Sequence, residues 1–155
     1  MRAVLDPNVL ISALLTPHGK PALVVRSWLA GAFELFVSES LLAELQRALG
    51  YPKLRALIEP TEAQELLDLL RREAEVIDDP DSPPAIRSPD PDDDYLIALA
   101  MSARAVLVSG DGHLLGLGAH LPVYAPAEFL ALLAQETGPT RSLARGPKGP
   151  DRLLE

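Results

Sequence analysis

Acidic side chains recur in this sequence where short apolar segments end or where helices are predicted to begin. The acids placed in this way are Asp6, Glu44, Asp92, Asp93, Asp94 and Asp111. Asp6 ends the apolar run 2–5, and Asp111 follows the apolar run 105–108 by three residues. In an open parallel sheet a ligand site lies outside the carboxyl ends of the strands, where helix N-termini also point. All of these acids can therefore face one crevice.

Several carboxylates in one crevice repel one another and take up protons unless a divalent cation supplies the opposing charge. Hard oxygen ligands of this kind suit Mg²⁺ or Mn²⁺. One or two such ions can act on the attacking water and on the leaving oxygen of a phosphodiester, with no covalent enzyme intermediate. The sequence offers no recognisable arrangement of Ser, Cys or His that would form a nucleophile instead. The acids thus indicate metal-assisted phosphodiester hydrolysis.

Each acid also has a purely structural interpretation. An Asp at a strand end is commonly a helix cap or a turn residue, which would account for Asp6. Asp92, Asp93 and Asp94 are favourable charges for the first turn of a helix, and Glu44 lies at the margin of an apolar helix face. The catalytic interpretation depends on their joint placement, because the other acids of the chain fall on predicted helix surfaces and loops.

The elements that must position these acids are short apolar strands alternating with amphipathic helices. The predicted strands are 2–5, 33–37, 75–77, 105–108 and a short one around Val123. The predicted helices are one beginning at Pro7, 21–30, 38–49, 65–74 behind a capping box of Thr61 and Gln64, one opening with Asp90 and Pro91 and running to 103, and 126–133. Residues 78–89 are rich in Asp and Pro and predict a surface loop. The alternation predicts a parallel sheet with helices on both faces.

Length and composition predict one intracellular domain. The chain has 155 residues, of which 48% are hydrophobic and 23% charged, enough for one buried core. It has no cysteine, which excludes disulfides and thiolate metal sites. We find no signal peptide and no membrane-spanning run, so we expect a cytoplasmic protein. Residues 1–137 are the predicted domain, and residues 138–155, rich in Gly, Pro and Arg, are predicted to be a flexible tail.

The net charge of −8 bears on the partner. Nucleic-acid-binding proteins usually show a basic footprint, whereas residues 1–137 carry a net charge of −10 and residues 138–155 one of +2. Either the partner is not a polyanion, or many carboxylates serve a bound cation that reverses the local field. The candidates for contacts to a nucleic-acid backbone, with a solvated surface as the alternative role, are Arg47, Lys53, Arg55, Arg71, Arg72 and the arginines of the tail.

Four segments of the chain resemble the PIN-domain family of nucleases. They are VLDPNVLISALL, LLAELQRAL, DPDDDYLIALA and VLVSGDGHLL, in the order and rough spacing of that family, so that the resemblance spans residues 2 to about 133. The similarity is greatest to the branch of toxins of type II toxin-antitoxin pairs, which is related to virulence-associated protein C. It implies a three-layer α/β/α fold with a central parallel sheet of about four or five strands, and an endoribonuclease that depends on Mg²⁺ or Mn²⁺. It also implies an RNA substrate, a homodimer and a small antitoxin partner.

The resemblance also implies roles for individual residues. It assigns catalysis and metal binding to Asp6, Glu44, Asp94 and Asp111. It assigns supporting roles to Asn8, Asp92 and Ser109. Within the run of three acids, the family's pattern selects Asp94, leaves Asp92 as an outer candidate, and makes Asp93 mainly a first-turn charge.

Two departures from the family's pattern leave alternatives open. Pro7 replaces the usual Ser or Thr between Asp6 and Asn8, and Gly112 with His113 stands where many relatives have a polar residue and a second acid. The first alternative is therefore a catalytically weak or inactive PIN fold that binds protein or nucleic acid. The second is a phosphatase of the haloacid dehalogenase type, which would require an Asp in place of Asn8.

Overall fold

The centre of the molecule is a five-stranded sheet in which all neighbouring strands are parallel. The computed structural model describes residues 1–136. Its strands are β1 (Arg2–Leu5), β2 (Glu34–Val37), β3 (Glu75–Val76), β4 (Val106–Val108) and β5 (Val123–Tyr124), in the spatial order β3-β2-β1-β4-β5. The predicted parallel sheet is confirmed, and the predicted tail, residues 138–155, lies outside the described residues.

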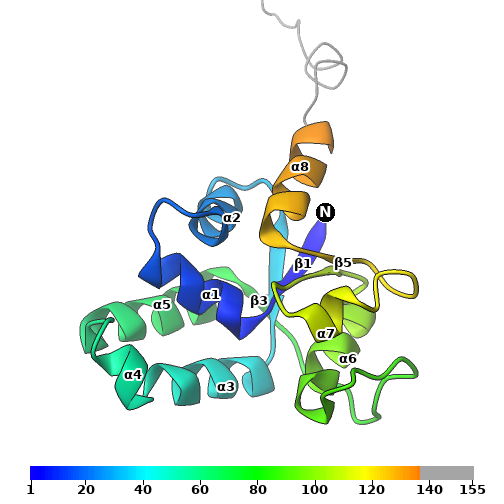
Figure 1. The fold of residues 1–155 in the computed structure, drawn as a ribbon, viewed down its shortest axis with the longest axis horizontal. Helices are drawn as coiled ribbons and strands as arrows, with labels where there is room; N and C mark the ends of the chain where they lie inside the picture. Colours follow the sequence, from blue (N-terminus) through cyan, green and yellow to red (C-terminus); the bar gives the residue numbers. More distant parts are fainter. Residues whose placement is uncertain (137–155) are drawn as a thin grey trace, which may run out of the picture.

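Helices cover both faces of this sheet. They are α1 (Pro7–Leu15), α2 (Lys20–Leu29), α3 (Glu39–Leu49), α4 (Pro52–Arg55), α5 (Pro60–Glu73), α6 (Asp94–Ala103), α7 (Gly112–Leu115) and α8 (Pro126–Glu136), with a 3₁₀ turn, η1 (Pro91–Asp93), before α6. Figure 1 shows α1, α2 and α5 on one side of the sheet and α6 and α7 on the other, with α6 packed against β1, β2 and β4. The three-layer α/β/α architecture is therefore confirmed.

The strand order creates a crevice beside β1. The chain winds outward from β1 to β3 on one side and then returns to β4 on the other side of β1. The connections that leave the carboxyl ends of β1 and β4 consequently run to opposite faces of the sheet, and this divergence is where open α/β sheets bind their ligands. Asp6 directly follows β1, and Ser109 directly follows β4.

A continuous apolar core holds the strands and helices in place. Ala3, Val4 and Leu5 of β1 are completely buried, as expected for a central strand covered on both faces. Phe33, just before β2, meets Phe129 of α8 edge to face, with ring centroids 4.9 Å apart. This aromatic pair docks the last described helix on the body of the domain. No helix in residues 1–136 has the length and apolar character needed to cross a lipid bilayer.

Some local predictions need correction. The helix predicted over 65–74 begins earlier, at Pro60, and its capping box pairs Glu59 with Glu62. Thr61 and Gln64 therefore lie inside the helix, because Pro60, which has no N–H to satisfy, takes its first position. The short helices α4 and α7 were not predicted; each is a single turn, too short for an apolar period to show.

Candidate active site

Asp6 is buried at the carboxyl edge of the sheet, between the two central strands. Its backbone N–H donates to the carbonyl of Val108 at 2.9 Å, so the residue stays bound to β4 after β1 has ended. The residue is only 4% exposed. Its Oδ1 accepts a hydrogen bond from the N–H of Asn8 at 3.0 Å, which caps α1. Asp6 is therefore a helix cap, as its structural interpretation predicts, and the capping hydrogen bond fixes its carboxylate in one orientation.

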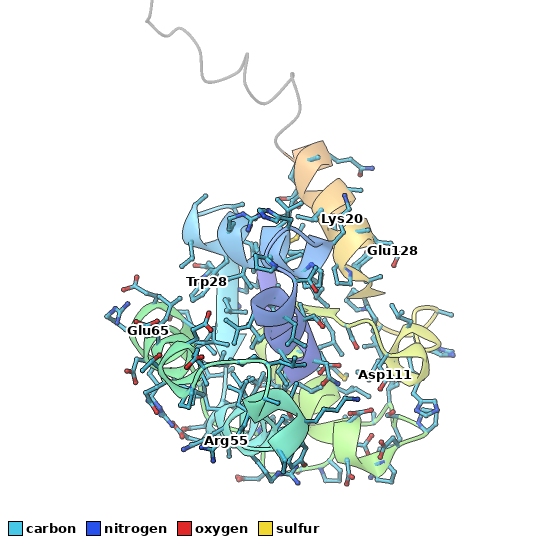
Figure 2. All side chains as sticks on the ribbon, turned by 60° about the vertical axis from the view of Figure 1, so that its left-hand side comes forward. Lys20, Trp28, Arg55, Glu65, Asp111 and Glu128 are labelled. Carbon is cyan, nitrogen blue, oxygen red and sulfur yellow. The ribbon has the colours of Figure 1, made fainter. Side chains whose placement is uncertain are left out.

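Ser109 connects Asp6 to Asp111. Its completely buried hydroxyl donates to Asp6 Oδ2 at 2.8 Å and accepts from the N–H of Asp111 at 3.0 Å. Asp111 in turn accepts from the N–H of His113 at 2.8 Å and caps α7. Figure 2 shows Asp111 on the opposite side of the molecule from Glu65 of α5. The predicted association of Asp6, Ser109 and Asp111 is therefore present.

A cavity of about 200 Å³ opens beside Asp6, and we call it the acid cavity. Its lining residues are Asp6, Pro7, Asn8, Glu44, Arg47, Ala48, Asp90, Asp92, Asp93, Tyr95 and Leu96. Helix α3 contributes Glu44, and the turn η1 contributes Asp92 and Asp93. The predicted convergence of acids from separate segments is observed for Glu44 and Asp92, and the cavity also contains Asp93.

Asp93, and not Asp94, is the acid of the run that faces Asp6. Burial, together with the charges of Asp111 and Asp6, raises the pKa of Asp93 to about 6. One of its oxygens, Oδ2, is buried and has no hydrogen-bond partner among the described residues. An unpaired buried carboxylate oxygen among other acids is unfavourable and is suited to bind a positive charge.

Asp94, the acid that the family's pattern selects, does not line the acid cavity but a separate cavity beside the loop 78–89. Its Oδ1 accepts a hydrogen bond from the N–H of Ser88 at 2.7 Å, and its Oδ2 lies 3.7 Å from Nη1 of Arg87. It therefore anchors the loop 78–89. Asp92 and Asp93 line the acid cavity, whereas the carboxylate of Asp94, at the next position, is held at the loop.

The apolar pattern of α6 is compatible with Asp93 but does not by itself select it over Asp94. Residues three and four apart share a helix face, and the residues at these spacings after Asp93 are Leu96 and Ile97, which are 1% and 0% exposed. The same spacings after Asp94 lead to Ile97 and to the smaller Ala98. Both spacings lead to buried residues, so it is the hydrogen bond of Asp94 to Ser88 that distinguishes the two acids.

The charges of the site are only partly compensated. Burial is the main cause that raises the pKa of Asp6, while hydrogen bonds from Asn8 and Ser109 lower it and the charges of Asp111 and Glu44 raise it. Glu44, half-buried on α3, is in contact with the guanidinium of Arg47. The acid cavity therefore contains several carboxylates and a single basic side chain, Arg47.

The donor set fits a hard divalent cation. All of its groups are carboxylate oxygens, which Mg²⁺ and Mn²⁺ prefer, and the unpartnered Oδ2 of Asp93 is free to bind. In residues 1–136, however, no three Asp, Glu or His side chains are already grouped as ligands of one ion. The oxygens of Asp6 retain further lone pairs beside their hydrogen bonds, whereas one oxygen of Glu44, Oε1, is in contact with Arg47.

Comparisons with known proteins agree with this fold. The family model described as PIN domain matches residues 2–113. An uncharacterized protein of Methanocaldococcus jannaschii is 28% identical over 142 residues, which are 84% of this chain and 90% of that protein. The crystal structure of VapBC2 from Rickettsia felis bound to a DNA fragment from their promoter is similar with a TM-score of 0.53 and 18% identity, covering 79% of this chain and 97% of that one.

Proposed function

The chain belongs to the PIN-domain family, and on this premise we propose that it is a metal-dependent endoribonuclease, the toxin of a toxin-antitoxin pair. PIN domains are generally nucleases. The observation that carries the proposal is the convergence of Asp6, Glu44 and Asp93 on one cavity, with Asp111 joined to Asp6 through Ser109. Because the chain belongs to the PIN-domain family, the alternative of a haloacid dehalogenase-type phosphatase is set aside.

Four acids of this site would hold Mg²⁺ or Mn²⁺, namely Asp6, Glu44, Asp93 and Asp111. When bound, the cation supplies Lewis-acid activation of water and stabilisation of the charge that develops on the phosphodiester. Asp93 replaces Asp94 in this assignment, because the carboxylate of Asp94 is bound to Ser88 on the loop 78–89. Asp92, which is exposed and lines the same cavity, remains an outer candidate.

The remaining residues of the site orient these acids. The hydroxyl of Ser109 holds the carboxylate of Asp6 and the backbone of Asp111 in one arrangement. Asn8 donates its backbone N–H to the capping carboxylate of Asp6, and its side chain is exposed at the cavity. Burial of Asp6 keeps bulk water from its carboxylate, which strengthens its interaction with any bound charge. These residues act by holding oxygens in place and not by moving protons.

Pro7 is compatible with this function. It is buried at the first position of α1, where a helix has no use for a backbone N–H. The carboxylate of Asp6 accepts its helix-capping hydrogen bond from the N–H of Asn8, so the missing donor of Pro7 does not loosen the carboxylate. The departure from the family's pattern therefore removes a hydroxyl from the site and leaves its backbone geometry intact.

The antitoxin and a second copy of the chain are proposed as partners. Both follow from the resemblance to the toxin branch, and the likeness in fold to VapBC2 supports the first. Expression of the chain should arrest bacterial growth, and co-expression of a small protein encoded next to it should relieve the arrest. Growth that continues normally at confirmed expression would contradict the toxin role without touching the nuclease proposal.

The decisive experiment is cleavage of a labelled single-stranded RNA by the full chain after treatment with EDTA. Cleavage should return when Mn²⁺ or Mg²⁺ is added, and Asp6→Asn should reduce it by more than ~100-fold. Activity that persists in EDTA, or that Asp6→Asn leaves unchanged, would overturn the proposal. RNA binding without any cleavage would favour the alternative of a non-catalytic binding module.

A further inference from the structure

Arg47 stands at the junction of two cavities. The acid cavity is continued on its outer side by a second cavity of about 510 Å³, which we call the outer cavity. The residues that line the outer cavity are Ser40, Ala43, Glu44, Arg47, Asp92 and Tyr95. Arg47 lines both, and it is the single basic residue in either lining. The two cavities also share Glu44, Asp92 and Tyr95, so a strand that occupies both comes close to the guanidinium of Arg47.

The guanidinium is held by Glu44, three residues earlier on α3. Nη2 of Arg47 donates to Oε1 of Glu44. The two side chains are 63% and 35% exposed, respectively. The hydrogen bond and the charge of Glu44 raise the pKa of Arg47, and the charge of Asp92 adds to this effect. Arg47 is thus permanently charged, and its ion pair is partly in water, where such pairs are weak and can be exchanged.

A phosphodiester strand meets a repulsive surface at this edge. The carboxylates that line the acid cavity are Asp6, Glu44, Asp90, Asp92 and Asp93. A bound divalent cation would compensate part of this charge, but the phosphates on either side of the bond that is cut also need donors. A guanidinium suits this task, because its N–H groups form a fork that matches two oxygens of one phosphate.

We propose that Arg47 is an exchangeable counter-charge: it neutralises Glu44 while the site holds no cation, and it turns to a phosphate of the RNA in the outer cavity once a cation takes Glu44. This inference rests on the function proposed above. It assigns the outer cavity as the subsite for the phosphate next to the scissile bond, with Arg47 as its substrate-binding residue.

Two measurements on Arg47→Ala test the exchange, because removal of the guanidinium should have opposite effects on them. The first is binding of Mn²⁺ alone, measured by calorimetry on the full chain without RNA. Since a competitor for Glu44 is lost, the Kd for Mn²⁺ should fall by about twofold to fivefold. The second is cleavage of single-stranded RNA at saturating Mn²⁺, where KM should rise by roughly tenfold or more while kcat changes less.

Two further variants serve as controls. Arg47→Lys keeps the charge and loses the fork, so its affinity for Mn²⁺ should stay near that of the wild type while KM rises by about threefold. Arg71→Ala removes an exposed arginine of the same kind, bound to Glu39 at 2.9 Å outside both cavities, and should change neither quantity. Arg47 lies on the surface of α3, so all three proteins should fold.

The outcomes separate this inference from the function on which it rests. If the wild type binds Mn²⁺ and cleaves RNA while Arg47→Ala leaves the Kd for Mn²⁺ unchanged or raises it, the exchange is overturned and the proposed function stands. The same holds if KM does not move. If the wild type binds no Mn²⁺, the proposed function fails and the exchange fails with it.

Discussion

Asp93 and Asp94 are neighbours in sequence, yet their replacement by Asn should have contrasting effects. Asp93 faces the acid cavity with an unpartnered oxygen, whereas Asp94 accepts a hydrogen bond from Ser88 in the loop 78–89. Asp93→Asn should therefore reduce metal-dependent RNA cleavage by more than ~100-fold. Asp94→Asn keeps an oxygen that can accept from Ser88, so its activity should stay within a few-fold of the wild type.

Stability should change in the opposite sense from activity. Burial and repulsion raise the pKa of Asp93 from its ordinary value of 3.8 to about 6. A pKa difference of one between the folded and unfolded chain corresponds to 1.36 kcal/mol, so the rise from 3.8 to about 6 corresponds to about 3 kcal/mol. Because the side chain of Asp93 is partly exposed, screening by solvent reduces this destabilisation to ~1–2 kcal/mol. Because Asn carries no charge, Asp93→Asn should raise the free energy of unfolding by that amount at neutral pH without added cation.

The pH dependence of this gain has a definite sign. The pKa of Asp93 is higher in the folded chain than in the unfolded chain, so the folded state loses stability as this carboxyl ionises. The advantage of Asp93→Asn should be absent below about pH 4, grow between pH 4 and 6, and remain constant above pH 6. Urea denaturation of both proteins at pH 4, 5, 6 and 7 measures this difference.

Asp94→Asn is the matched control for these measurements. It loses only a weak ion pair with Arg87 at 3.7 Å, so it should be less stable than the wild type by at most ~1 kcal/mol. If Asp94→Asn is the inactive variant and Asp93→Asn is active, the placement of Asp93 in the metal site is wrong. If Asp93→Asn is less stable than the wild type at pH 7, the argument from burial and repulsion is refuted.

Three further predictions concern the site and the tail. Ser109→Ala should lower the free energy of unfolding by ~1–3 kcal/mol in urea titrations, because Asp6 loses a buried donor, and a neutral result would show that the hydroxyl does not hold the acids together. Mn²⁺ should raise the melting temperature of the wild type in a concentration-dependent way and that of Asp6→Asn much less, as scanning calorimetry would show; equal shifts would place the ion elsewhere. Removal of residues 138–155, which lack apolar periodicity, should leave the melting temperature nearly unchanged, and a loss of several degrees would show that the tail docks on the domain.

Local patterns in the sequence were sufficient for much of the fold. The apolar runs that end at Asp6 and precede Asp111 predicted buried parallel strands, and the predicted helix 38–49 matches α3, for which Ser38 is the N-cap. These signals are short-range, since a strand or a cap depends on residues within a few positions of it. The family to which the chain belongs could also be identified from four short segments.

The composition of the site depended on contacts that no local pattern contains. The hydroxyl of Ser109 reaches Asp6 across 103 positions of sequence, and it does so because β4 pairs with β1. The choice of Asp93 over Asp94 depended on the phase of one helical turn, where a shift of a single residue rotates a side chain by roughly 100°. The position of Arg47 between two cavities depended on how α3 and the turn η1 come together beside Asp6. Sequence by itself therefore determined which acids were available at the edge of the sheet, whereas only the tertiary structure decided which of them meet, because their contacts are set by strand pairing and helix phase.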